Sequence, residues 1–226
     1  HGNFFDTGFE TIKNHFNGLI NLVKVIDKSR LEHFIQLSSS DTYGLNEHPQ
    51  DETMIDKPRS PYAFAKSINS KFLEFISEID HFPHTIIQIF IVYGGNQKKD
   101  RLIPYVINKC LNNQDFDIFS PNLVRDFCYI DDITNGIFKI IGNPKCIGQK
   151  INLASGKPLS VEKVVKIILD NIKLGKPKFH IKKNNNLNEN LYADISKIKK
   201  LINWKPKIEI HEGIERTINW YKKNDF

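Results

Sequence analysis

The chain has 226 residues, of which 40% are hydrophobic and 26% are charged, and its formal net charge is +6. These proportions are typical of a globular chain with one or two domains. No run of about 18 uncharged apolar residues is present, and the chain does not open with a basic segment followed by an apolar core. The composition therefore argues against an integral membrane protein and against a secreted one.

The three cysteines, Cys110, Cys128 and Cys146, lie far apart and form no CxxC pair. We therefore expect neither a disulfide framework nor a zinc site, and we predict no metal. A reducing cytoplasm is the compartment that fits this cysteine usage best.

The positive charge comes mostly from lysines scattered among Asn and Ile. The densest basic runs, at 182–183 and 199–200, are short and have no aromatic residues between them. This pattern favours a solvated surface over a nucleic-acid site, so we expect no nucleic-acid partner and no membrane partner.

Helical and strand patterns alternate in the first part of the chain. Apolar residues at three- and four-residue steps indicate helices, with Pro61 in the first turn of the second, and short apolar runs indicate buried strands. Residues 41–60 form a long polar loop, and loops of that length in compact domains are usually functional or disordered. The expected elements are a helix over 9–26, a strand over 33–37, a helix over 61–79 and a strand over 85–92. This strand, helix, strand order makes a crossover unit, and the fold class is α/β.

After Gly95 the pattern is less regular, and no internal repeat is visible. We interpret this half as a smaller lobe packed beside the sheet. The expected elements are helices at 103–111, from about 132 and at 161–172, two closing helices, and extended pieces at 116–119, 127–130, 150–153 and 178–181.

Tyr62 and Lys66 are the most informative pair of side chains. On a helix, positions i and i+4 lie on one face, so the Lys66 ammonium would lie close to the Tyr62 phenol. A nearby positive charge favours phenolate and would lower the phenol pKa from about 10 toward working pH, as a general base requires. The alternative is a tyrosine packed beneath a lysine stem with no chemical role.

A run of serines at 38–40 ends the strand that precedes this helix. Ligands of open α/β sheets bind at the carboxyl ends of strands, so a serine hydroxyl there could meet the tyrosine. The alternative is that the serines cap backbone groups in a turn, which we prefer for Ser38.

With these residues the chain resembles the extended short-chain dehydrogenase/reductase family, the NAD-dependent nucleotide-sugar epimerases and dehydratases. The resemblance spans nearly the whole chain, and six motifs in order are far more specific than any one of them. The motifs are SSSDTYG at 38–44, SPYAFAK at 60–66, VYG at 92–94, RDFCYIDD at 125–132, ADISK at 193–197 and WKP at 204–206.

The resemblance implies hydride transfer at a sugar carbon with NAD or NADP, and more readily NAD. Tyr62 would exchange a proton with the sugar hydroxyl, and Ser39, or failing it Ser40, would hydrogen-bond the reacting oxygen. Lys66 would hold the nicotinamide ribose and lower the tyrosine pKa, with Tyr62 and Phe90 also in the cofactor site.

The resemblance also implies a diphosphate site. Arg125 would contact the diphosphate of a nucleotide sugar, helped by Arg101, because a guanidinium offers a bidentate fork to phosphate. The alternative for Arg125 is a surface ion pair with Asp126. For Asp131 and Asp132 we expect capping of the helix that follows.

The chain departs from the family pattern in several places. The glycine-rich GxxGxxG turn that would cradle the cofactor pyrophosphate is absent, and the chain begins at His1 with its only methionine at Met54, so we expect a fragment. The other departures are Gln88, Ile91 and Gly95 in place of the usual Arg, Asn and Pro, and the Asn-rich stretch 184–190 in place of an arginine stretch.

Domain organisation follows from the resemblance. We expect a partial Rossmann-like parallel sheet, lacking its N-terminal strands, with a smaller C-terminal α+β substrate lobe. Residues 1–95 would be the C-terminal part of the dinucleotide-binding domain. Residues 96–226 would be dominated by the substrate lobe, with segments returning to the sheet.

Three functions stay open. Family dehydratases carry Thr-Asp-Glu where this chain has Ser39, Ser40 and Asp41, so 4-epimerisation or ketosugar reduction is favoured over dehydration or decarboxylation, which Asp41 keeps open. The rival is an inactive fragment that retains only an interaction surface. In the family, helices 9–26 and 61–79 correspond to a dimer interface, so we expect a homodimer.

Overall fold

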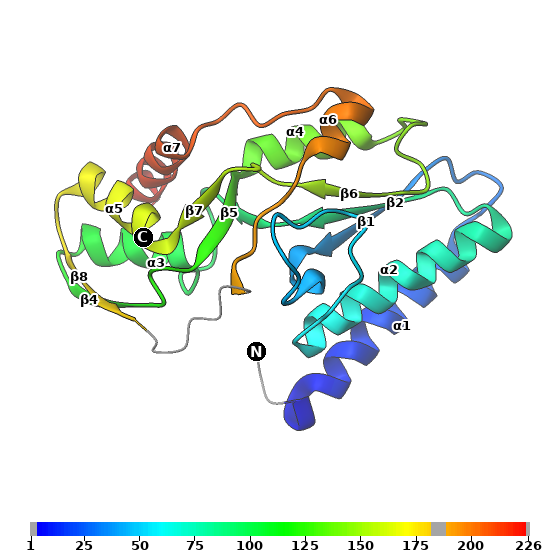
Figure 1. Ribbon diagram of the computed structural model, residues 1–226, viewed down its shortest axis with the longest axis horizontal. Helices are drawn as coiled ribbons and strands as arrows, with labels where there is room; N and C mark the ends of the chain where they lie inside the picture. The colour runs from blue at the N-terminus through cyan, green and yellow to red at the C-terminus, as the bar shows by residue number, and fades with distance from the viewer. Residues whose placement is uncertain (1–3, 182–188, 225–226) are drawn as a thin grey trace.

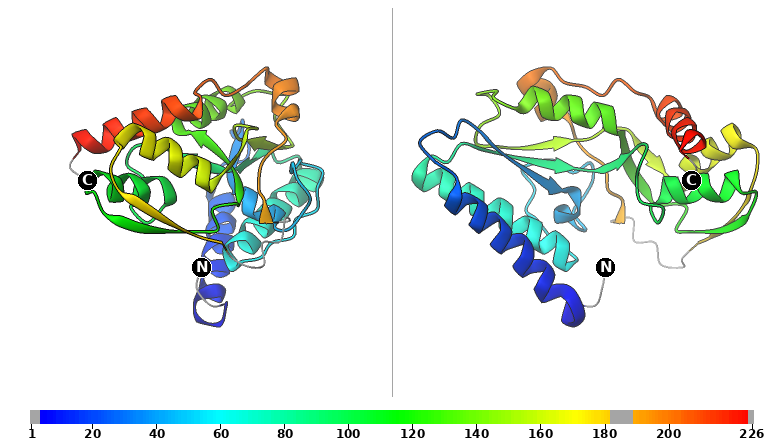
Figure 2. Two further views of the ribbon diagram at one scale, coloured as in Figure 1. Left: turned by 60° about the vertical axis from the view of Figure 1, so that its left-hand side comes forward. Right: turned by 180° about the vertical axis from the view of Figure 1, so that it is seen from behind.

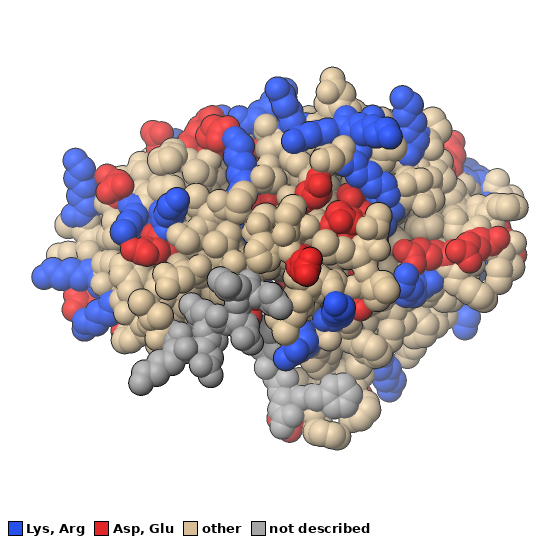
Figure 3. All heavy atoms as spheres, viewed as in Figure 1, with Lys and Arg blue, Asp and Glu red and all other residues tan. Residues whose placement is uncertain are grey.

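The computed structural model describes residues 4–181 and 189–224 (Figure 1). Part of the Asn-rich stretch and the basic pair at 182–183 lie outside these residues. Among the described residues, no helix combines the length and the apolar character needed to cross a lipid bilayer. On the face seen in Figure 3, basic and acidic side chains are interspersed.

The first sheet is parallel and has the order β1-β2-β6, formed by β1 (Phe34–Ser39), β2 (His84–Ile89) and β6 (Gln149–Leu153). Helices α1 (Phe9–Val25) and α2 (Pro61–Asp80) cover one face, and α4 (Ile130–Ile140) and α6 (Ser196–Ile202) cover the other (Figure 1). The π-helical turn η1 (Phe4–Gly8) precedes α1. The predicted α/β class is confirmed.

The second lobe lies at the other end of the molecule from α1 and α2 (Figures 1 and 2). It has one sheet of order β3-β5-β7 and a parallel pair, β4 with β8. Helices α3, α5 and α7 pack around one buried cluster with these strands. The bounds are β3 (Ile91–Tyr93), α3 (Leu102–Leu111), β4 (Asp115–Phe119), β5 (Val124–Tyr129), β7 (Pro158–Ser160), α5 (Val161–Ile172), β8 (Lys176–His180) and α7 (Ile210–Lys223).

The apolar run at 85–92 is one strand in the sequence pattern and two in the structure. Strand β2 belongs to the first sheet, whereas β3 pairs with β5 in the second. The break falls at Phe90, whose side chain is 6% exposed. The apolar run continues through both strands, so hydrophobicity alone could not reveal where the chain changes sheets.

The predicted capping role of Asp131 and Asp132 is wrong. Tyr129 occupies the N-cap position of α4 and no side chain caps it. The buried Asp132 carboxylate instead accepts backbone N–H groups of Lys207 and Ile208 at 2.9–3.0 Å. It therefore ties the start of α4 to the segment before α7.

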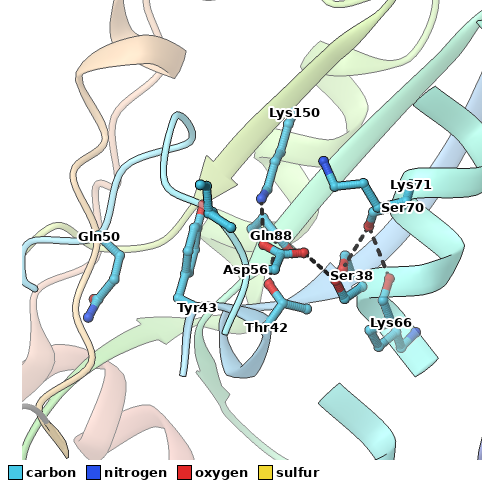
Figure 4. A network of polar contacts seen from close by, with 12 residues as sticks. Ser38, Thr42, Tyr43, Gln50, Asp56, Lys66, Ser70, Lys71, Gln88 and Lys150 are labelled. Atoms are coloured by element: carbon cyan, nitrogen blue, oxygen red, sulfur yellow. Dashed lines mark hydrogen bonds and ion pairs between the residues drawn. The ribbon is translucent and has the colours of Figure 1, made fainter. Parts of the chain in front are cut away.

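A polar network anchors the loop between β1 and α2 (Figure 4). Asp56 forms an ion pair with Lys150 of β6 at 2.9 Å and accepts the Ser67 hydroxyl of α2 at 2.7 Å. Tyr43, in the 3-10 turn η2 (Ser40–Tyr43), donates its hydroxyl to Asn152 of β6. The segment is thereby bound to β6 near both of its ends and to α2 near its second end.

Gly136 offers a test of packing between α4 and the sheet. A Cβ built there would lie 2.4 Å from a Leu153 methyl and 3.2 Å from the Trp204 ring. We expect Gly136→Ala to lower the free energy of unfolding by about 1–3 kcal/mol through overpacking, measured by chemical denaturation. Gly18→Ala is the matched control, because that helical site is exposed and nothing lies within 4 Å; it should be neutral or stabilise by up to about 1 kcal/mol. Equal stability of the two variants would contradict the tight contact.

Candidate active site

The end of β1 and the first turn of α2 bring together Ser39, Tyr62 and Lys66. Ser60 is the N-cap of α2 and its side chain accepts the Ala63 N–H at 3.1 Å. Pro61 is the first helical residue, so Tyr62 lies in the first turn of the helix. The Ser39 hydroxyl is a neighbour of the Tyr62 phenol and acts to lower the phenol pKa, and both side chains line one cavity. The sequence alone left open whether a serine would meet the tyrosine, and in the structure Ser39 does.

Lys66 lies one turn beyond Tyr62 on α2. Its ammonium is 5.8 Å from the centre of the Tyr62 ring and donates to the Leu37 carbonyl oxygen at 2.9 Å. The lysine is therefore held between the helix and β1, beside the phenol ring. This places one positive charge at the carboxyl end of the strand.

The other two serines differ from Ser39. Ser38 is buried, and its hydroxyl lies 3.4 Å from that of Ser70 on α2, so the expected turn-capping role for Ser38 is wrong. Ser39 itself accepts the Asp41 N–H at 3.2 Å and so caps η2 as well as meeting Tyr62. Ser40 is buried within η2 and lines the pocket described next.

A cavity of about 760 Å³ lies between the two lobes. It collects most of the residues that the sequence singled out, although they come from different elements of both lobes. Lys66 is not part of its lining. The lining includes Ser39, Ser40, Asp41, Tyr62, Phe90, Arg101 and Arg125.

Asp41 is the carboxylate of this cavity. Burial raises its pKa, while the positive charges of Arg125 and Arg101 oppose that rise. The negative charge of Asp41 in turn raises the pKa of Tyr62. Asp41 therefore interacts electrostatically with both the tyrosine centre and the two arginines.

The pKa of Tyr62 is raised, and the expectation that Lys66 lowers it is wrong for this chain by itself. Burial is the main cause and the Asp41 charge adds to it; the Ser39 hydroxyl and Arg101 act in the opposite sense. Burial also lowers the pKa of Lys66. Helical spacing brings the two groups together, but burial favours the neutral form of each.

Arg125 is not paired with Asp126. Its guanidinium donates to the backbone carbonyls of Val124 and Glu189 at 2.9 and 2.7 Å. Asp126 is fully buried and accepts the N–H groups of Ser155 and Gly156 at 2.7 and 2.8 Å. Successive side chains of a strand point to opposite faces, so Arg125 faces the cavity and Asp126 faces the core.

Two site residues were missed by sequence reasoning. Phe119 of β4 lines the far part of the cavity, and a lone aromatic at a strand end carries no distinctive signal. His15 of α1 packs its ring against Tyr62, with ring centres 5.5 Å apart. Its signal was a polar aromatic side chain between the apolar Ile12 and Phe16 of the predicted helix.

The charge of Asp41 provides a test of the site's electrostatics. Asp41→Asn removes a negative charge that raises the Tyr62 pKa, so the phenol should ionise at lower pH than in the unmodified chain. The measurement is a pH titration followed by NMR of tyrosine labelled with ¹³C at Cζ. Asp115→Asn, at an exposed position of β4, is the control and should leave that pKa unchanged. An unchanged or higher Tyr62 pKa in Asp41→Asn would contradict the assigned coupling.

Comparisons with known proteins show the family of the chain. Residues 2–217 match the family model described as GDP-mannose 4,6 dehydratase. UDP-glucuronate 4-epimerase of Thermodesulfobacterium geofontis is 32% identical over 221 residues, covering 94% of this chain and 66% of that protein. Human dTDP-D-glucose 4,6-dehydratase is 27% identical, covering 97% of this chain and 65% of that protein. The chain thus spans about two thirds of the length of these relatives.

Solved structures of similar proteins share the fold of this chain. UDP-glucuronic acid 4-epimerase from Bacillus cereus, in complex with UDP-glucuronic acid and NAD, has a TM-score of 0.85 at 25% identity and covers 94% of this chain and 68% of its own. UDP-glucose 4-epimerase from Thermotoga maritima has a TM-score of 0.88 at 23% identity, covering 96% and 72%, and shows the fold alone. The chain belongs to the GDP-mannose 4,6-dehydratase family, within the NAD-dependent epimerases and dehydratases of the extended short-chain dehydrogenase/reductases.

Proposed function

We propose that this chain carries the proton-transfer residues and the sugar pocket of an NAD-dependent nucleotide-sugar 4-epimerase or ketosugar reductase. The observation that carries the proposal is that Ser39 and Tyr62 line the same cavity as Arg101 and Arg125. A hydroxyl pair and two guanidinium groups are what a sugar joined to a diphosphate requires. The kinship with UDP-glucuronate 4-epimerase supports this substrate class.

Tyr62 is the proton carrier in this proposal. Because its pKa is raised, the phenol is protonated at neutral pH, and this form can donate a proton to a sugar carbonyl oxygen. Ser39 lies in the same cavity and would orient the same sugar oxygen. Lys66, fixed by the Leu37 carbonyl, keeps a positive charge beside the ring.

The diphosphate and base would lie along the rest of the cavity. Arg125 and Arg101 are the cations that the cavity offers to phosphate oxygens. Phe119 and Leu123 give an apolar surface farther along, suited to the flat face of a nucleobase. The substrate would thus be held at both ends, with its sugar next to Tyr62.

The residues present fit the nicotinamide end of a dinucleotide. The half-buried Lys66 ammonium suits ribose hydroxyls, and Phe90 gives an apolar wall to the cavity beside Tyr62. When bound, the dinucleotide supplies the hydride acceptor and donor for the sugar carbon. The relatives solved with NAD favour NAD over NADP, although one similar structure holds NADPH.

A second candidate is a 4,6-dehydratase or a decarboxylase. Asp41 favours it, because a buried carboxyl group with a raised pKa can carry a proton at a sugar carbon next to the oxidised one. Kinship with dTDP-D-glucose 4,6-dehydratase supports the same candidate. The products separate the two: a 4-keto-6-deoxy sugar or carbon dioxide in place of a 4-epimer.

Replacing Tyr62 by Phe tests the function. We expect the full-length gene product to interconvert the 4-epimers of a UDP-sugar and Tyr62→Phe to lower kcat by about 10²–10⁴-fold, because the proton carrier is lost. The measurement is product analysis by NMR or chromatography. Tyr105→Phe, outside the cavity, is the matched control and should keep the rate. An unchanged rate in Tyr62→Phe would refute the proposed chemistry, and a protein that only offers an interaction surface would convert no sugar at all.

We also propose that α1 and α2 form a homodimer interface. The two helices pack side by side (Figure 1). Several of their apolar side chains are exposed. Exposed apolar patches of this kind mark contact surfaces. The exposed residues are Phe9, Leu22, Val25, Phe64, Phe75 and Ile79, at 46–80% exposure.

Phe75 provides the test of the dimer. Phe75→Glu would place a charge in a buried contact, so we expect a dimer of the unmodified chain to become a monomer. The measurement is molar mass by light scattering after size exclusion. Phe138→Glu, on the exposed face of α4 at 71% exposure, is the control and should remain dimeric. A monomeric unmodified chain would contradict the proposed interface.

The cytoplasm is the compartment that we propose. All three cysteines are unpaired and buried, which suits a reducing environment.

A further inference from the structure

His15 of α1 is the aromatic neighbour of Tyr62. The centres of the imidazole and phenol rings are 5.5 Å apart, and the ring planes meet at 73°, an edge-to-face arrangement. The backbone at this position is also fixed, because Asn69 of α2, which is 3% exposed, donates its side-chain amide to the His15 carbonyl at 3.3 Å. The imidazole is therefore held against the phenol by α1 and α2 together.

Lys66 is the charge that acts on this imidazole. Burial and the Lys66 ammonium both lower the pKa of His15, so the ring is neutral at neutral pH. From α2, the ionisable groups facing it are Tyr62 and Lys66. The residues one turn away on α1 are not ionisable: Thr11, Ile12, Gly18 and Leu19. The nearest charged residues of α1 and η1 are exposed: Asp6, Glu10 and Lys13.

We propose that His15 is a positioning residue for the catalytic tyrosine: its neutral imidazole holds the Tyr62 ring toward Ser39, and its protonation releases the ring. The catalytic consequence rests on the proposed function, in which Tyr62 carries the proton. The change in packing does not rest on it. The result is a proton-transfer centre that is assembled at neutral pH and loosened in acid.

Charge and hydration explain the release. A protonated imidazole would be a second cation beside the Lys66 ammonium, and no acidic side chain among the described residues is paired with His15 to offset it. The cation is more stable in water than against a half-buried phenol, and solvent is within reach because the ring is only partly buried. Tyr62 then loses the contact that restrains its ring opposite Ser39.

NMR of the chain itself tests the proposal without substrate or cofactor. We expect strong nuclear Overhauser effects between the His15 and Tyr62 rings at pH 8, falling several-fold by pH 5. Their midpoint should coincide with the His15 titration and lie below about 6.5, the ordinary histidine value. His15→Phe keeps an aromatic ring without the titrating group, so its contact with Tyr62 should be independent of pH. His211→Asn, on the exposed side of α7, is the control and should behave as the unmodified chain does.

Two outcomes would overturn the inference. One is a ring contact that stays constant while His15 titrates, and the other is the same loss of contact in His15→Phe as in the unmodified chain. The linked titration in a protein that converts no nucleotide sugar would instead support the positioning role and refute the proposed function. The two proposals can therefore fail separately.

Discussion

The buried ion pair between Asp56 and Lys150 is the interaction on which the site depends. Its side chains are 5% and 12% exposed, and Asp56 also accepts the Ser67 hydroxyl of α2. One carboxylate thus joins the loop after η2, the third strand of the first sheet and the helix that carries Tyr62. A buried charge left without its partner is costly, so the three elements have one stable arrangement. The long loop is therefore an ordered connection between Ser39 and Tyr62.

The pKa shifts of the ionisable groups in and around the tyrosine centre follow from burial more than from charge pairing. Tyr62 and Asp41 have raised pKa values and Lys66 and His15 lowered ones, so each shift favours the neutral form. Arg101 and Arg125 counteract the burial of Asp41. The two guanidinium groups thus lie in the same cavity as Tyr62, a distribution suited to a sugar attached to an anionic diphosphate.

Sequence periodicity was a good guide where one element buries one face. The helices predicted over 9–26 and 61–79 are α1 and α2, and the helix at 161–172 has the bounds of α5. Sequence periodicity gave no guidance where a residue or strand contacts a segment far away in the sequence. Asp132 binds backbone groups of Lys207 and Ile208. Strands β2 and β3 belong to different sheets and are separated at Phe90. The residues near Asp132 and Phe90 in the sequence do not indicate either contact.

By itself the sequence determined the α/β class, the pairing of Tyr62 with Lys66 on one helical face and the family, because these depend on spacing along the chain. Tertiary structure decided that Arg125 faces the cavity away from Asp126 and that His15 contacts the phenol. It also decided the sign of the Tyr62 pKa shift. Burial is set by every element that packs around a group, and no local pattern records it.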